Sequence, residues 1–132
     1  MSYNVGPRFT FRGLIPPGSD KEHIGIVLNE KESTVLYCYC TSKGEKIINN
    51  DFVNIPKEKM LQYFNDPKET FIFISERHIF SLPSFTLKSR LDNEYDVLEP
   101  IDDDTYEVII DKIKNSNNLS ARFKKELLEF LK

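Results

Sequence analysis

Two apolar runs in the first third of the chain follow each other closely, and each has the length of a β-strand. They cover residues 23–28 and 34–41, and the five polar residues between them suit a hairpin loop. A third run, residues 70–75, is the most apolar in the chain and leads directly into three ionisable residues. We therefore expect a sheet with this third run as a central strand and with polar side chains where the strands end.

Weaker patterns surround these three runs. Residues 9–15 alternate between apolar and polar positions before the turn residues Pro16, Pro17 and Gly18. Further short strands are expected at 47–48 or 52–53, at 78–91 as an irregular strand or loop that Pro83 interrupts, and at 95–98. Many short strands separated by turn residues are typical of a compact antiparallel barrel.

Two segments near the end of the chain have helical periodicity. Residues 102–115 place apolar side chains at helical spacing, and Asp104 and Glu107 have the spacing of a capping box. Residues 120–131 predict a second helix, with Ser120 as its N-cap.

A further helix is expected inside the sheet region, over residues 57–65, because Pro56 favours the first turn of a helix. The order of elements predicts an α+β protein that is mainly β with flanking helices. We expect a single domain over residues 1–132, with a barrel core at about 6–98 and the two helices after it.

Composition excludes several classes of protein. No apolar run approaches the roughly 20 residues of a membrane-spanning helix, and the first residues lack the features of a signal peptide, so we expect a cytoplasmic protein with no membrane partner. Cys38 and Cys40 share one face of a strand, where a disulfide would be strained, so we expect reduced, partly buried thiols. Alternation places Tyr37 and Tyr39 on the other face, and which face points inward stays open.

Charge is distributed unevenly. The chain has a net charge of −3, and the segment from Leu91 to Asp111 holds nine acids and no base. An acidic total argues against a protein that coats nucleic acid, although it leaves room for a local phosphate site. The acidic segment is either a solvated loop and helix start or, alternatively, a docking strip for a basic partner.

The polar residues at the strand ends have the chemistry that RNA cleavage without a metal needs. One group must take the proton of the ribose 2′-OH, another must protonate the leaving oxygen, and donors must hold the charge on phosphorus. Histidine suits the first two tasks and arginine suits the third. The candidates are His23 and His78 as acid and base, Arg77 as phosphate clamp, Thr41 or Ser42 as hydroxyl donor, and Glu76 as an alternative base.

A simpler interpretation stands beside this one. Each candidate, taken singly, is also explained as an ordinary polar residue at the end of a strand. If the strand continued through residues 76 and 77, alternation would place Glu76 and Arg77 on opposite faces of the sheet. The sequence has no glycine-rich phosphate loop, no Ser-His-Asp arrangement and no cluster of metal ligands. Kinase, serine hydrolase and metalloenzyme functions are therefore not expected, nor is a cofactor.

The order of these segments resembles the MazF/PemK toxins of bacterial toxin–antitoxin pairs. The resemblance covers roughly residues 6–119 and rests on four places: Lys21–Leu28, Cys40-Thr41-Ser42, Ile74–His78, and Val97–Asp102 entering the helix after it. The arginine that precedes the first strand in that family has no counterpart here, and His23 stands nearest to its place.

The resemblance implies an SH3-like, PemK-like barrel and a homodimer. It also implies a metal-independent endoribonuclease that cleaves single-stranded RNA and is held in check by a cognate antitoxin. Two alternatives remain: a barrel of the same fold that has lost the chemistry and binds a protein target, and a small interaction module without toxicity.

Overall fold

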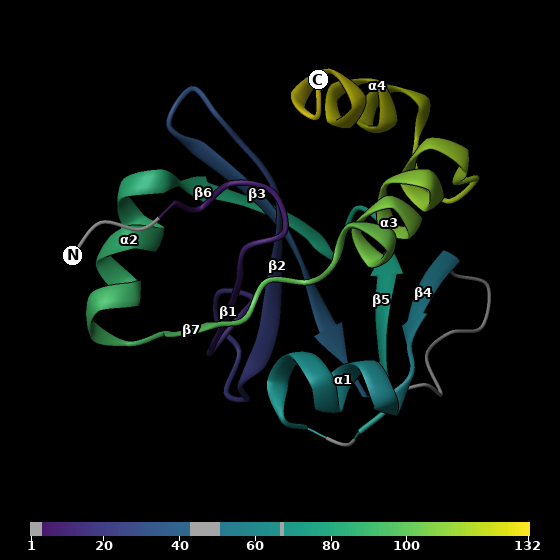
Figure 1. The fold of residues 1–132 in the computed structure, drawn as a ribbon. Helices are drawn as coiled ribbons and strands as arrows, with labels where there is room; N and C mark the ends of the chain where they lie inside the picture. The colour runs from purple at the N-terminus through teal and green to yellow at the C-terminus, as the bar shows by residue number, and fades with distance from the viewer. Residues whose placement is uncertain (1–3, 43–50, 67) are drawn as a thin grey trace.

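The computed structural model describes residues 4–42, 51–66 and 68–132. In these parts the chain forms seven strands and four helices (Figure 1). The strands are β1 (Thr10–Gly13), β2 (His23–Lys31), β3 (Thr34–Thr41), β4 (Asp51–Ile55), β5 (Thr70–Ile74), β6 (Ile79–Pro83) and β7 (Asp96–Leu98). The helices are α1 (Lys57–Phe64), α2 (Ser84–Asn93), α3 (Asp103–Asn115) and α4 (Ala121–Phe130).

The strands form one antiparallel sheet in the order β4-β5-β3-β2-β1-β7, with β6 paired to β3 outside this path. The α+β class expected from the sequence is confirmed. The path of described strands is open, so the barrel stays a prediction. The strand expected at 52–53 lies within β4, whereas the alternative at 47–48 falls outside the described residues.

The hairpin between β2 and β3 is tighter than the sequence predicted. Lys31 pairs with Thr34, so only Glu32 and Ser33 form the turn, both with positive φ, as a two-residue hairpin turn requires. Polar residues continue β2 because α4 covers them: Asn29 donates from Nδ2 to the carbonyl of Phe130 at 2.9 Å. A tertiary contact therefore extends the strand beyond its apolar run.

The edge of β3 is shared by two strands, and this arrangement positions the candidate site. Cys40 and Thr41 pair with the start of β5, whereas residues 34–38 of β3 pair with β6. After its pairing with β3, the second half of β5 remains paired with β4 alone. The turn 75–78 then returns the chain to β3, which places His78 beside Tyr39.

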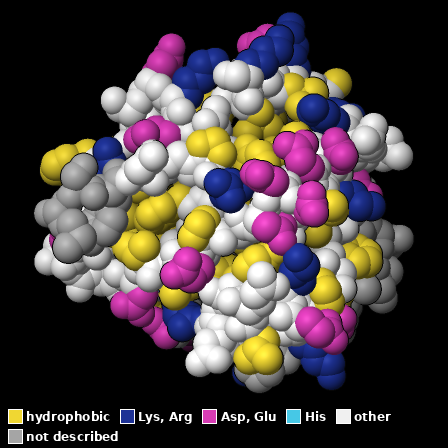
Figure 2. Space-filling view, in the orientation of Figure 1, with side chains coloured by type: hydrophobic (Ala, Val, Ile, Leu, Met, Phe, Trp, Pro, Cys, Tyr) yellow, Lys and Arg dark blue, Asp and Glu magenta, His cyan; other side chains and the backbone are white. Residues whose placement is uncertain are grey.

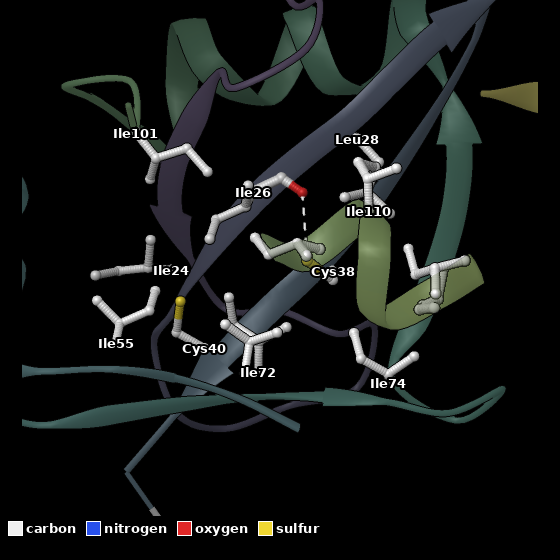
Figure 3. Close-up of a cluster of buried hydrophobic side chains, with 14 of the residues drawn as sticks. Ile24, Ile26, Leu28, Cys38, Cys40, Ile55, Ile72, Ile74, Ile101 and Ile110 are labelled. Carbon is white, nitrogen blue, oxygen red and sulfur yellow. Dashed lines mark hydrogen bonds between the residues drawn. The ribbon is translucent and has the colours of Figure 1, made fainter. Parts of the chain in front are cut away.

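Both faces of β3 are buried, which answers the question left open by alternation. Cys38 and Cys40 belong to a core formed with the helices α1, α3 and α4 (Figure 3). Tyr37 belongs to a second core on the other face, which α2 covers. Both thiols are free and buried, and burial raises the pKa of Cys38 to about 12, so neither is a reactive nucleophile.

Helix α2 corrects the expectation of an irregular strand or loop at 78–91. Its two buried leucines, Leu87 and Leu91, lie one helical turn apart, whereas Phe85 is 82% exposed. Two apolar residues are too few to show a helical periodicity in the sequence, and Pro83 before them suggested an interruption. Pro83 is the N-cap of the helix and therefore marks its beginning.

Helix α3 begins at a different cap from the one expected. Asp102 is its N-cap and accepts a hydrogen bond from the backbone N–H of Thr105 at 2.7 Å, so Asp104 does not cap the helix. The other carboxylate oxygen of Asp102 accepts from Nζ of Lys59 on α1 at 2.7 Å. The expected cap of α4 is confirmed, because Oγ of Ser120 accepts from the N–H of Phe123.

Substitution of Asp102 tests this cap. Asp102→Ala is expected to lower the free energy of unfolding by about 1 kcal/mol, and Asp102→Asn by less, because asparagine still caps the helix. The Lys59 ammonium, Tyr63 and the Thr105 N–H hold the pKa of the Asp102 carboxyl well below its ordinary range. Its contribution is therefore present at neutral pH and is lost as the pH falls below about 4.

Denaturant titrations at pH 7 and at pH 3 or below measure this effect. The difference between wild type and Asp102→Asn should shrink as the pH falls. A difference that stayed constant would show that the carboxylate charge has no part in the stability of the cap.

Acidic side chains cluster on the face that carries α3, interspersed with apolar ones (Figure 2). Two of the acids at the start of α3 have cationic partners, Arg8 with Asp103 at 3.3 Å and Lys59 with Asp102. Carboxylates in the first turn also interact favourably with the helix dipole. Within the described parts of the chain, none of the helices has both the length and the apolar character of a membrane span.

Candidate functional site

Two adjoining hollows lie where β2 begins and β3 ends. The first, here the aromatic hollow, has a volume of about 590 Å³ and is lined by Pro16, Pro17, Gly18, Ser19, Asp20, Lys21, His23, Tyr39, Thr41, Phe73 and His78. The second, here the cationic hollow, has a volume of about 240 Å³ and is lined by Arg12, Lys21, Glu22, His23, Ile24, Cys40, Thr41, Ser42, Met60, Asp66, Lys68 and Thr70. They share Lys21, His23 and Thr41 as a common wall.

His23 has a defined orientation in this common wall. It is the first residue of β2 and lies opposite Gly13 of β1. Its Nδ1 lies 2.7 Å from the carbonyl oxygen of Ile15. Because a carbonyl can only accept, Nδ1 carries the proton of this hydrogen bond, and Nε2 holds the lone pair of the neutral ring. The hydrogen bond to Ile15 therefore leaves Nε2 as the ring nitrogen that can accept a proton.

His78 lies on the other side of Tyr39. Its ring centroid is 5.7 Å from that of Tyr39 and 5.0 Å from that of Phe73, and the ring of His23 is 5.2 Å from Tyr39. Oγ of Ser75 forms a hydrogen bond with Nδ1 of His78 at 2.5 Å. Burial raises the pKa of the Tyr39 hydroxyl, which keeps it neutral between the two imidazoles.

Thr41 and Ser42 end β3 at the same place. Thr41 is buried and lines both hollows, whereas Ser42 is exposed and lines the cationic hollow. The structure thus brings together four of the residues selected from the sequence, His23, Thr41, Ser42 and His78. Their catalytic roles stay predictions.

Glu76 and Arg77 lie outside both hollows. The turn at 75–78 leaves both side chains exposed, and neither lines either hollow. Oε1 of Glu76 accepts a hydrogen bond from the backbone N–H of Ser120 at 3.1 Å, and this contact lowers the pKa of the carboxyl. Glu76 therefore anchors the start of α4, and the structure gives no support to its selection as an alternative base or to that of Arg77 as the phosphate clamp.

Three cations that sequence reasoning missed line the cationic hollow instead. Arg12 comes from β1, Lys21 from the segment before β2, and Lys68 from the segment before β5. Within the described ranges none of the three forms an ion pair. Lys21 could have been found from its place two residues before His23. The register of β1 and the position of Lys68 depend on contacts between distant segments.

The described residues hold no group of three or more histidines, cysteines or carboxylates placed to bind a metal ion. The sequence matches no model of a known protein family, and it matches none of the curated proteins. The arrangement of the two hollows therefore carries the functional proposal.

Proposed function

We propose that the protein is a toxin-like, metal-independent endoribonuclease that cleaves single-stranded RNA. The observation that supports it best is the pair of imidazoles, His23 and His78, on either side of Tyr39 in a hollow that also holds Lys21 and Thr41. The resemblance to the MazF/PemK toxins supports the same proposal. On the basis of this resemblance we also propose an SH3-like barrel, a cytoplasmic homodimer and inhibition by a cognate antitoxin.

The proposed reaction uses the two histidines as base and acid. Nε2 of His23 takes the proton of the ribose 2′-OH, and the 2′-oxygen attacks the adjacent phosphorus. The bond from phosphorus to the 5′-oxygen breaks, and protonated His78 gives its proton to that leaving oxygen. The products are a 2′,3′-cyclic phosphate and a 5′-hydroxyl, and no other reactant is consumed.

Lys21 and Thr41 have the chemistry to stabilise the transition state. Charge develops on the oxygens of the phosphorane, and an ammonium and a hydroxyl that are already in place lower the barrier. Lys21 lines both hollows, so it takes the role that the sequence assigned to Arg77. A lysine acts there as a point charge and lacks the two-pronged geometry of a guanidinium.

The aromatic hollow favours single-stranded RNA. The ring centroid of His78 lies 5.7 Å from that of Tyr39 and 5.0 Å from that of Phe73. Unpaired bases stack on such rings, whereas bases in a duplex are already stacked. The net charge of −3 also disfavours extended binding along a duplex.

Cleavage of a 5′-labelled RNA of mixed sequence in EDTA tests the proposal. Purified protein is expected to make discrete cuts that leave 2′,3′-cyclic phosphate ends, because the attacking oxygen comes from the substrate. A matched RNA with 2′-O-methyl groups should resist cleavage, since it has no 2′-OH. Intact RNA after incubation with folded protein, or equal cleavage of the methylated RNA, would contradict the proposal.

A non-catalytic role in binding a protein is the second candidate. A third hollow between α1 and β7 exposes Leu61 and Val97, which are 51% and 45% accessible, beside Glu99. Apolar side chains with a polar rim are typical of protein-binding surfaces. Folded protein that left RNA intact would favour this role, either against a protein target or as an interaction module.

A further inference from the structure

We infer that the cationic hollow is a second phosphate subsite, which holds the phosphate next to the one that is cut. This inference rests on the proposed function for the identity of its ligand, single-stranded RNA. It adds a residue that the proposed reaction does not use, Lys68, and a place for a part of the strand that does not react.

The charged side chains of the cationic hollow suit a phosphate group. Arg12, Lys21 and Lys68 come from three separate segments and face one hollow without an ion pair among the described residues. Two acids, Glu22 and Asp66, line it as well. Among the described residues of its lining, the three cations exceed the two acids by one charge when His23 is neutral, and one of the three, Lys21, is shared with the aromatic hollow.

Asp66 contacts the backbone of Lys68 and forms no ion pair with its ammonium. Oδ1 of Asp66 accepts a hydrogen bond from the backbone N–H of Lys68 at 3.1 Å. The carboxylate is therefore held by the backbone of Lys68, while the exposed side chain of Lys68 forms no ion pair with a described residue. An ammonium in that position binds a phosphate oxygen as a point charge.

The relation of the two hollows identifies the ligand as a continuous strand. They share Lys21, His23 and Thr41, so a strand that places one nucleotide in the aromatic hollow enters the cationic hollow with its next linkage. The volumes of the two hollows agree with this arrangement: the aromatic hollow has about 590 Å³ and the cationic hollow about 240 Å³. The larger one suits a base, and the smaller one suits a phosphate group.

Binding of an uncleavable 2′-O-methyl RNA oligonucleotide, measured at several salt concentrations, tests the subsite without requiring catalysis. Lys68→Ala is expected to weaken binding about three- to tenfold at low salt. It should reduce the slope of log Kd against log salt by about 0.7, the value for one phosphate contact on a single strand. Lys112→Ala is the matched control, because Lys112 is an exposed lysine on α3 that lines neither hollow.

A second measurement locates the phosphate. In a cleavable RNA, the linkage on either side of the mapped cut is replaced in turn by an uncharged methylphosphonate. With the linkage that occupies the subsite neutralised, Lys68→Ala should cleave as fast as wild type, whereas the unmodified RNA should show a three- to tenfold difference.

The outcomes separate the two proposals. If wild type cleaves RNA and Lys68→Ala behaves like Lys112→Ala, the subsite is overturned and the proposed function stands. If wild type binds RNA with a salt slope that depends on Lys68 yet cuts nothing, the nuclease proposal fails and the subsite stands. If wild type does not bind RNA, both are overturned.

Discussion

Replacing His23 by alanine is expected to lower the rate of RNA cleavage about 100- to 10,000-fold, which is the usual contribution of a general base. The hydrogen bond from Nδ1 to the carbonyl of Ile15 leaves Nε2 as the basic nitrogen of the ring. Alanine removes that nitrogen and also the hydrogen bond. We therefore expect a large kinetic loss together with a decrease of about 1 kcal/mol in stability.

His23→Asn separates these two effects. The asparagine amide nitrogen takes a place close to Nδ1 and can donate to Ile15, but the side chain has no atom that replaces Nε2. Cleavage by His23→Asn should be as slow as cleavage by His23→Ala, with stability nearer to wild type. Single-turnover rates and denaturant titrations measure the two quantities. Normal cleavage by His23→Asn would show that His23 positions the loop before it and is not the base.

Gly13→Ala is expected to lower the free energy of unfolding by about 3 kcal/mol, because the added methyl group has no room. A Cβ at this position would lie 2.1 Å from Cδ1 and 2.4 Å from Cε1 of Tyr95. The ring of Tyr95 is buried and stacks on Phe11, and its hydroxyl accepts a hydrogen bond from Arg90. The ring can move only if the core beneath α2 also moves.

Gly6→Ala is the matched control for this substitution. A Cβ at Gly6 would meet only Oδ1 of Asn4, at 3.4 Å, so its effect should stay within about 0.5 kcal/mol. Because Gly13 pairs with His23, Gly13→Ala should also reduce cleavage under conditions in which the protein remains folded. Equal stabilities of the two variants in thermal and denaturant unfolding would contradict the close approach of Tyr95 to β1.

Local sequence patterns were sufficient to predict most of the strands and helices. The strands in the apolar runs and the helices at 57–65, 102–115 and 120–131 lie within a few residues of their predicted positions. Helix α2 was missed because the signal of its two buried leucines is short. The expected hairpin loop was too long, because the contact of Asn29 with α4 is not visible in the local sequence.

The candidate site was predictable only in part. His23 and His78 stood out because both are imidazoles at strand ends, and that chemistry is readable from the sequence. The position of both beside Tyr39 depends on β3 pairing with β2 on one side and with β5 and β6 on the other, which the order of strands does not reveal. The same is true of Glu76, whose role in anchoring α4 is a contact across 44 positions of the chain.

The sequence by itself determined the α+β class, most of the elements and the residue types available for chemistry, because periodicity and side-chain chemistry are local properties. Only the tertiary structure decided that both faces of β3 are buried and that β5 and β6 divide its edge. It also decided that Arg12, Lys21 and Lys68, and not Arg77, line the cationic hollow. The physical reason is that strand register and the position of turns are set by packing between distant segments, and a shift of one residue would turn each side chain to the opposite face.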